Sequence, residues 1–310
     1  MGRYLAILAG LAAAGIWGGM YDVSKVVLEV VPPFSLLALR LVLGFLALAA
    51  VLLWRAQRLP SRRDSLRFMA VGAVGFGLSL SLQFIGTHLS TASNAALVTS
   101  ASPAFMVIFA AVLLKENVGS RKLAALVLAS LGVVAVIDPR TAQLDVTRWW
   151  GNLALLGAAL TWGLYSVLVK QTSQDHSIVM VSAFGFLGGL VPVLPAAGLE
   201  LRTVTIGSVT PWVVAGVVYL GVVSTAVAMV LWTQSLVSLE ASTVSVLFFA
   251  QPAVGVGLGA WLLGDQLGLA FWAGAALILL GVLGAGWDEA RQSGDRLSAT
   301  PSTHGGEPLT

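Results

Sequence analysis

The chain has 310 residues, of which 57% are hydrophobic and 10% are charged, with a formal net charge of +3 and no cysteine. Soluble domains carry about 25% charged residues, so this composition excludes an ordinary soluble fold. The lack of cysteine excludes disulfides and thiolate metal sites. The positive charge is too small and too dispersed to indicate a nucleic-acid partner, and the lipid bilayer is the expected surrounding.

Ten hydrophobic segments, bounded by Pro, Gly and charged residues, follow one another along the chain. The stretch 68–114 contains no Lys, Arg, Asp or Glu. As one helix it would be ~70 Å long, more than twice a hydrocarbon core of ~30 Å, so it must cross the membrane more than once. We therefore predict an all-α polytopic membrane protein with ten transmembrane helices. Their expected bounds are 4–26, 34–54, 67–87, 92–114, 121–138, 151–171, 177–198, 211–234, 242–263 and 269–287.

The distribution of Lys and Arg predicts that both chain ends lie in the cytoplasm. With the N-terminus inside, twelve basic residues flank the spans on the inner side and four on the outer side, while Arg40 lies within the second span. Residues 288–310 are polar and rich in Gly, Ser, Thr and Pro, which predicts a disordered cytoplasmic tail. We expect a multi-pass protein of the bacterial inner membrane.

The chain resembles itself at two long separations. Residues of the first predicted helix recur 145 positions later, and residues of the later helices recur 149 positions later. The matched pairs are Trp17 with Trp162, Gly18 with Gly163, Lys25 with Lys170, Ser93 with Ser242, Pro103 with Pro252, and Gly132 with Gly281.

Five helices per half is an odd number, so the second half enters the membrane in the opposite orientation. We predict two inverted five-helix repeats, 1–140 and 141–287, around a central cavity. Such repeats place a substrate site near the midplane where the halves meet. This arrangement favours a transporter that moves a small molecule by alternating access. A monomer is sufficient for this mechanism, and the sequence does not determine the oligomeric state.

Several motifs resemble those of a known superfamily. They are Trp-Gly late in the first helix of each half, Ala-Ser and Pro in the fourth helix followed by Lys115-Glu116, and Gly264-Asp265 after its counterpart. Together they resemble the drug/metabolite transporter superfamily, specifically the EamA family, over residues 4–287. The chain further resembles YddG-like amino-acid exporters, which implies a large central cavity and export of apolar, aromatic and other neutral amino acids.

Two other functions stay open. The first is export of drugs or other metabolites. The second is an integral-membrane enzyme. It is less favoured because the chain has no His-Glu-x-x-His or Gly-x-Ser-x-Gly motif. We therefore expect no enzyme activity, no catalytic residues, no cofactor and no metal site.

Four aromatic residues are candidate substrate contacts. Trp17 and Trp162 occupy matched positions near the middle of their helices, whereas membrane tryptophans usually lie at the interfaces. Tyr21 follows Trp17 by one turn, and Tyr165 lies close to Trp162 in the sequence. Their rings offer an apolar surface with a hydrogen-bonding edge. The alternative is that they fill space between helices.

Polar residues inside spans are costly unless they are paired or hydrated, so they are also candidates. Ser and Thr have an ordinary alternative, a bond to their own helix backbone. Arg40 either anchors helix ends or balances a substrate carboxylate. No carboxylate lies at the midplane, which favours a facilitative or indirectly driven exporter over tight proton coupling. The remaining substrate-binding candidates are Gln83, His88, Asn94, Thr99, Ser102, Ser242 and Gln251.

Overall fold

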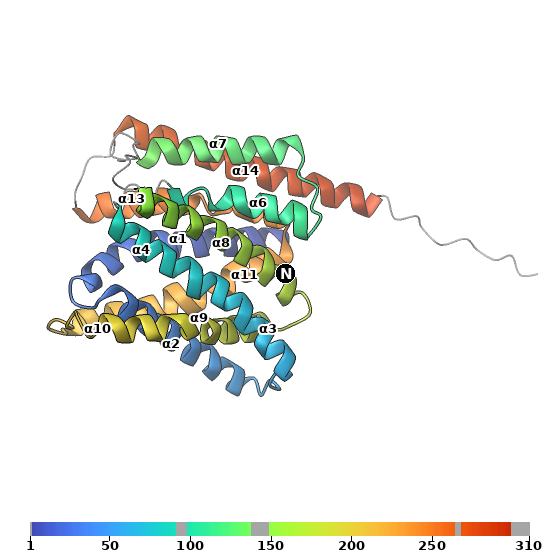
Figure 1. Cartoon of the computed structure of the whole chain (residues 1–310). Helices are drawn as coiled ribbons and strands as arrows, with labels where there is room; N and C mark the ends of the chain where they lie inside the picture. Colours follow the sequence, from blue (N-terminus) through green and yellow to red (C-terminus); the bar gives the residue numbers. More distant parts are fainter. Residues whose placement is uncertain (1, 91–97, 138–148, 264–267, 299–310) are drawn as a thin grey trace, which may run out of the picture.

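Helices make up every regular element in the part of the chain that the computed structural model describes, residues 2–90, 98–137, 149–263 and 268–298. Most of them run side by side across the molecule (Figure 1). Two of the elements, η1 and η4, are π-helical segments. In chain order the elements are α1 (Arg3–Leu28), α2 (Pro33–Trp54), α3 (Arg62–Gly72), η1 (Ala73–Ser79), α4 (Leu80–Leu89), α6 (Ser102–Leu113), α7 (Ser120–Ile137), α8 (Trp149–Ser173), α9 (Ile178–Glu200), α10 (Pro211–Val218), η4 (Tyr219–Val227), α11 (Ala228–Ser238), α12 (Ala241–Leu247), α13 (Ala250–Leu263) and α14 (Leu269–Ser298).

Seven helical runs in the described residues are long and apolar enough to cross a membrane. Two shorter apolar helices, Ser102–Leu113 and Trp272–Ala285, accompany them. The protein is therefore a helical, multi-pass membrane protein, and the count of ten spans stays a prediction. The seven runs are Arg3–Leu28, Pro33–Trp54, Arg62–Leu89, Trp149–Ser173, Ile178–Glu200, Pro211–Ser238 and Ala241–Leu258.

Large apolar side chains lie on the outer surface of the helix bundle as well as in its core. Leu53, Val191 and Leu279 are exposed on α2, α9 and α14, while Leu37 and Phe186 are fully buried between helices. Because such an outer surface would be unfavourable in water, it is the surface that contacts lipid.

The helices of the N-terminal part pack mainly against helices far along the chain. α7 lies along α14, α2 along α9, and α1 against α11 and α13, while α8 packs on α4 and α6. Figure 1 shows α7 and α14 side by side at one edge of the bundle, with α2 and α9 at the opposite edge. Between these edges Figure 1 shows α1, α4, α6, α8, α11 and α13.

Local chemistry sets several helix ends. The Ser61 hydroxyl accepts a hydrogen bond from the Asp64 N–H at the start of α3, and Thr210 does the same for Val213 at the start of α10. α2 begins with Pro33, whose missing N–H costs nothing at a first helical position. A distant residue completes this end, because the Glu200 carboxylate accepts from the backbone N–H of Ser35 at 2.8 Å.

The ninth predicted span, 242–263, is divided into two helices. α12 ends at Leu247 and α13 begins at Ala250. The cause is Pro252, which has no N–H for the Phe248 carbonyl and whose ring would clash with it. The Phe248 carbonyl instead accepts from the Gln251 N–H at 3.0 Å, in a three-residue turn.

The fourth predicted span differs in a similar way. A turn at residues 100–101 precedes α6, and Pro103 lies in its first turn. The Ala101 carbonyl accepts from the Ala104 N–H at 3.0 Å, again a three-residue turn. The expected start of this span, including Asn94, lies outside the described residues.

Three other helices differ from the expected spans in length or form. The third and eighth spans contain the π-helical segments η1 and η4, which no residue pattern indicated. The tenth continues as α14 to Ser298, so the first part of the expected irregular tail is helical. Glu289, Ala290, Arg291 and Gln292 in this part have high helix propensity, which favours the continuation.

Candidate functional site

The matched tryptophans meet at the centre of the bundle. Trp17 lies 14 residues after the start of α1 and 11 before its end, and Trp162 lies 13 after the start of α8 and 11 before its end. Their ring centroids are 5.8 Å apart with an edge-to-face angle of 79°. Trp232 and Phe248 contact Trp17 at 5.4 and 6.1 Å. We call these four residues the aromatic cluster.

A hydrogen bond to η4 fixes the orientation of Trp17. Its ring is 6% exposed, and its Nε1 donates to the backbone carbonyl of Ser224 at 2.9 Å. In a π-helix the bonds run to the fifth residue back, which leaves some carbonyls available to other groups. The π-helical segment therefore supplies the acceptor that a tryptophan at this depth needs.

Three hydrogen-bonding atoms in or beside the cluster are buried without a partner in the described structure. They are Nε1 of Trp162, Nε1 of Trp232 and the hydroxyl of Tyr165. Tyr165 is 1% exposed, and its ring lies 5.3 Å from Trp162 and 5.0 Å from Phe76. Because a buried donor without a partner costs about 1–3 kcal/mol, these atoms suit a ligand or a water molecule.

The other predicted site residues are dispersed. Ser102 donates to the carbonyl of Thr99 at 2.7 Å, which is the ordinary bond within its own turn. Gln83 is half-buried on α4, and His88 is exposed in the last turn of that helix. Tyr21 belongs to α1, but its side chain lies outside the described residues, as does all of Asn94. Gln251 is buried where α13 crosses α1.

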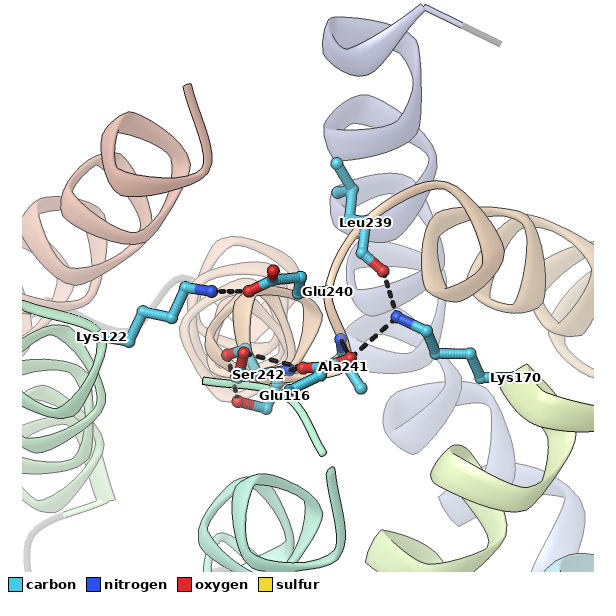
Figure 2. Close-up of polar contacts among 8 residues, drawn as sticks. Glu116, Lys122, Lys170, Leu239, Glu240, Ala241 and Ser242 are labelled. Carbon is cyan, nitrogen blue, oxygen red and sulfur yellow. Dashed lines mark hydrogen bonds and ion pairs between the residues drawn. The ribbon is translucent and has the colours of Figure 1, made fainter. Parts of the chain in front are cut away.

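Ser242 has a role that the sequence did not indicate. Its N–H and its hydroxyl both donate to Oε2 of Glu116 at 3.0 Å, and the Ala241 N–H donates to Oε1 at 2.7 Å. Glu116, which follows α6, thus caps the first turn of α12 (Figure 2). The carboxylate joins segments that are 125 residues apart in the sequence.

Two lysines complete this polar group, which we call the inner clasp (Glu116, Lys122, Lys170, Glu240 and Ser242). Lys170 of α8 donates to Glu116 at 2.9 Å and to the Leu239 carbonyl at 2.5 Å, while Lys122 of α7 pairs with Glu240. Figure 2 shows both ammonium groups pointing toward the start of α12 from opposite sides. In the sequence, this group could have been indicated by the acidic and basic residues that stand at the ends of neighbouring predicted spans.

The inner clasp favours the charged form of its carboxylate. Burial alone raises the pKa of Glu116, but the Lys170 ammonium and the N–H groups of Ser242 and Ala241 together outweigh burial and lower it. Glu116 is therefore ionised at neutral pH, and the clasp holds as a salt bridge.

A further charge lies within the membrane-spanning part, on α2. Nε of Arg40 donates to the Thr225 hydroxyl at 3.3 Å, and Nη2 lies 3.0 Å from Sδ of Met20. The described residues contain no group of three or more His, Cys, Asp or Glu that could hold a metal ion.

Comparison with known proteins yields one family and several relatives. The sequence profile of the EamA-like transporter family matches residues 4–137 and 149–287. An uncharacterised transporter of Archaeoglobus fulgidus is 26% identical over 241 residues, covering 76% of this chain and 82% of that protein. The uncharacterised transporter YcxC of Bacillus subtilis is 26% identical over 287 residues, covering 90% and 92%.

A solved structure shares the fold. A crystal structure superposes with a TM-score of 0.79 at 23% identity, covering 94% of this chain and 99% of that one. At this identity the likeness concerns the fold alone.

Proposed function

The chain belongs to the EamA-like transporter family, and from this premise we propose that it exports neutral, mainly apolar and aromatic, amino acids across the bacterial inner membrane. Transport proceeds by alternating access between two inverted five-helix halves. The aromatic cluster, which lies at the centre of the bundle between both halves, is the observation that carries this proposal.

Matched glycine contacts support the two inverted halves. A Cβ on Gly18 would lie 2.9 Å from the Gly255 nitrogen, and a Cβ on Gly163 would lie 2.8 Å from the Met106 nitrogen. These pairs are related by the separations of 145 and 149 residues found in the sequence. The first helix of each half therefore crosses the fourth helix of the other half at an equivalent point, with glycine allowing the close approach.

The last helices of the two halves, α7 and α14, also contact each other at equivalent positions. A Cβ on Gly132 of α7 would lie 2.7 Å from the Gly274 carbonyl oxygen, and a Cβ on Gly281 of α14 would lie 2.8 Å from the Ala125 carbonyl oxygen. Gly281 corresponds to Gly132 and Gly274 corresponds to Ala125, each at the repeat separation of 149 residues. The two stretches that match the family profile also coincide with the proposed halves.

The inner clasp supports alternating access, because it joins the proposed halves at one end. Glu116 and Lys122 belong to the first half, while Ser242 and Glu240 belong to the second. The positive-inside distribution of Lys and Arg predicts that this end faces the cytoplasm. Opening toward the cytoplasm would then require these hydrogen bonds to separate and the charges to be rehydrated.

Amino acids fit the aromatic cluster by their chemistry. Indole and phenyl rings accept an apolar side chain, and the unpartnered Nε1 of Trp162 and hydroxyl of Tyr165 can bind polar groups of the same ligand.

The test is counterflow in proteoliposomes that contain the purified protein, with phenylalanine, tryptophan, methionine and threonine as cargo. We expect saturable exchange that Trp17→Ala and Trp162→Ala each reduce more than they reduce folded yield. Uptake of no amino acid from a broad panel would refute the proposed cargo. Exchange of drugs instead would support the alternative exporter, and hydrolytic or transferase turnover would support an enzyme.

A further inference from the structure

Five arginines lie close together in the connection between α2 and α3. All five are exposed, and in the described structure none of them takes part in a hydrogen bond or an ion pair. Residues 55–67 contain no lysine and a single acidic residue, Asp64. The arginines are Arg55, Arg58, Arg62, Arg63 and Arg67. The segment therefore carries a concentrated positive charge at one end of α2.

The acidic residue of this segment does not neutralise the arginines. The Asp64 Oδ2 atom accepts from the Ser61 hydroxyl at 2.6 Å, and Oδ1 lies 3.9 Å from Nε2 of His176. Arg62 and Arg63 stand in the first turn of α3, where the helix dipole disfavours positive charge. The helix therefore gains nothing from these charges, and they require another explanation.

The connection is short, and hydrogen bonds hold its backbone. The Gln57 N–H donates to the Leu52 carbonyl at 3.1 Å, and the Ala56 N–H donates to the Leu53 carbonyl at 3.0 Å. Ala56 has a φ of 48°, the left-handed conformation in which many helices end. The arginines that follow this turn are thus kept near the end of α2.

Exposed apolar side chains accompany the arginines. Leu53, Trp54 and Leu59 are 79–83% exposed. A tryptophan at the end of a membrane-spanning helix is typical of the membrane interface. A partner that offers charge alone, such as free phosphate or a nucleic-acid backbone, would leave these three side chains in water. A lipid surface receives both kinds of side chain.

The corresponding connection of the second half shows that joining two such helices does not need these charges. Residues 201–210 join α9 to α10 and contain one charged residue, Arg202. The positive-inside rule also leaves the pattern unexplained, because it is satisfied by lysine or arginine in any cytoplasmic loop. Arginine alone, repeated five times within residues 55–67, indicates recognition of a ligand.

We propose that residues 53–67, which we call the basic loop, bind the phosphate groups of anionic phospholipids in the adjacent leaflet. A guanidinium forms two parallel hydrogen bonds with a phosphate, which lysine cannot reproduce. Clusters of basic residues directly beside a membrane-spanning helix attract anionic lipids. The three exposed apolar side chains insert beside the headgroups. This binding depends neither on the cargo nor on the aromatic cluster.

The experiment offers the purified protein in detergent an equimolar mixture of phosphatidylglycerol and phosphatidylcholine with the same acyl chains, and native mass spectrometry counts the lipids bound. We expect wild type to bind phosphatidylglycerol at least about tenfold more tightly, since each basic residue near a lipid surface contributes a factor of about five. The preference should weaken as salt is added, because salt screens exposed charges.

The triple variant Arg58→Gln/Arg62→Gln/Arg63→Gln tests the basic loop itself. Its preference for phosphatidylglycerol should fall below about threefold, the loss of three surface charges. The matched control is Lys25→Gln/Arg202→Gln, which removes exposed basic residues from other connections and should bind like wild type. In detergent both ends of the protein are accessible, so the comparison does not depend on topology.

Equal binding of the two lipids by wild type would overturn the proposal, and so would an undiminished preference in the triple variant. Displacement of phosphatidylglycerol by excess glycerol phosphate would assign the arginines to a soluble phosphate and would also overturn it. If the triple variant does not fold, the single variants Arg58→Gln and Arg62→Gln decide, each by a loss of about fivefold in the preference.

Discussion

At the residue scale, the two matched tryptophans differ in how they are held. Trp17 is bound to the Ser224 carbonyl, whereas Nε1 of Trp162 has no partner in the described structure. The Trp17 ring is thus held in one orientation, and the Trp162 ring keeps an N–H donor that a ligand can use. This asymmetry predicts different responses to the same substitution.

We predict that Trp17→Phe destabilises the protein by about 1 kcal/mol beyond Trp162→Phe, because only the former loses a hydrogen bond. Trp162→Phe should instead lower transport more than stability. Thermal unfolding in detergent and counterflow measure the two effects, with Trp212→Phe as control because that ring is 84% exposed. Identical losses of stability in both variants would contradict this division of roles.

Glu116 concentrates the hydrogen bonds of the inner clasp on one carboxylate. Replacing it by Gln leaves Lys170 without its countercharge, and breaking a buried pair costs on the order of 3 kcal/mol. We therefore predict a lower Tm for Glu116→Gln at pH 7, while Glu29→Gln, at an exposed position, should leave Tm unchanged.

The stabilisation by Glu116 should also depend on pH in a defined direction. Its folded-state pKa lies below the ordinary value of 4.5, so the charged form stabilises the clasp above pH 4.5, and this contribution is lost as pH falls through the folded-state pKa. The Tm difference between wild type and Glu116→Gln should be constant from about pH 5.5 to 7.5 and shrink in more acidic solution. A difference that grows on acidification would refute the assignment.

At the scale of helices, glycine decides where the long helices can approach one another. A Cβ on Gly72 would overlap the backbone of Gly185, and one on Gly188 would overlap the Met69 carbonyl, whereas a Cβ on Gly15 would meet no atom within 4 Å. The contact of α3 and η1 with α9 thus rests on backbone-to-backbone packing, which is typical of membrane helices.

We predict that Gly188→Ala destabilises the fold by about 1–3 kcal/mol, the usual cost of overpacking. Gly15→Ala on α1 should be neutral or stabilising by up to about 1 kcal/mol, because alanine is the better helix former and space is free. The temperature at which half of the detergent-solubilised protein aggregates reports both. Equal effects of the two alanines would mean that α9 can move away from α3 at little cost.

At the scale of the whole molecule, the distribution of Lys and Arg predicts which loops face the cytoplasm. The chain has no cysteine, so a single introduced cysteine reports on one loop without background. We predict that Arg202→Cys and Ser208→Cys react with a membrane-impermeant maleimide in intact cells. Arg58→Cys and Asp175→Cys should react only after the membrane is permeabilised, and the reverse pattern would invert the topology.

The sequence by itself determined that this protein lies in a lipid bilayer and approximately where its helices begin and end. Uncharged stretches such as 68–114 require lipid, and the structure has helices close to the expected bounds, as for 34–54 against Pro33–Trp54. The unusual membrane depth of Trp17 and Trp162 could also be predicted from the sequence, because the rise per residue of a helix gives the depth of each position. Pro252 could have indicated the break between α12 and α13, since its missing N–H acts locally.

Only the tertiary structure decided which distant residues meet. Glu116 caps α12, Arg40 bonds Thr225 and Trp17 bonds Ser224 across separations of 125 to 207 residues. Apolar helices of similar composition offer many pairings that hydropathy cannot distinguish, and the choice depends on the shapes of their surfaces, above all on where glycine lets backbones touch. The π-helical segment η4, whose Ser224 carbonyl accepts the Trp17 N–H, was likewise not indicated by any residue pattern.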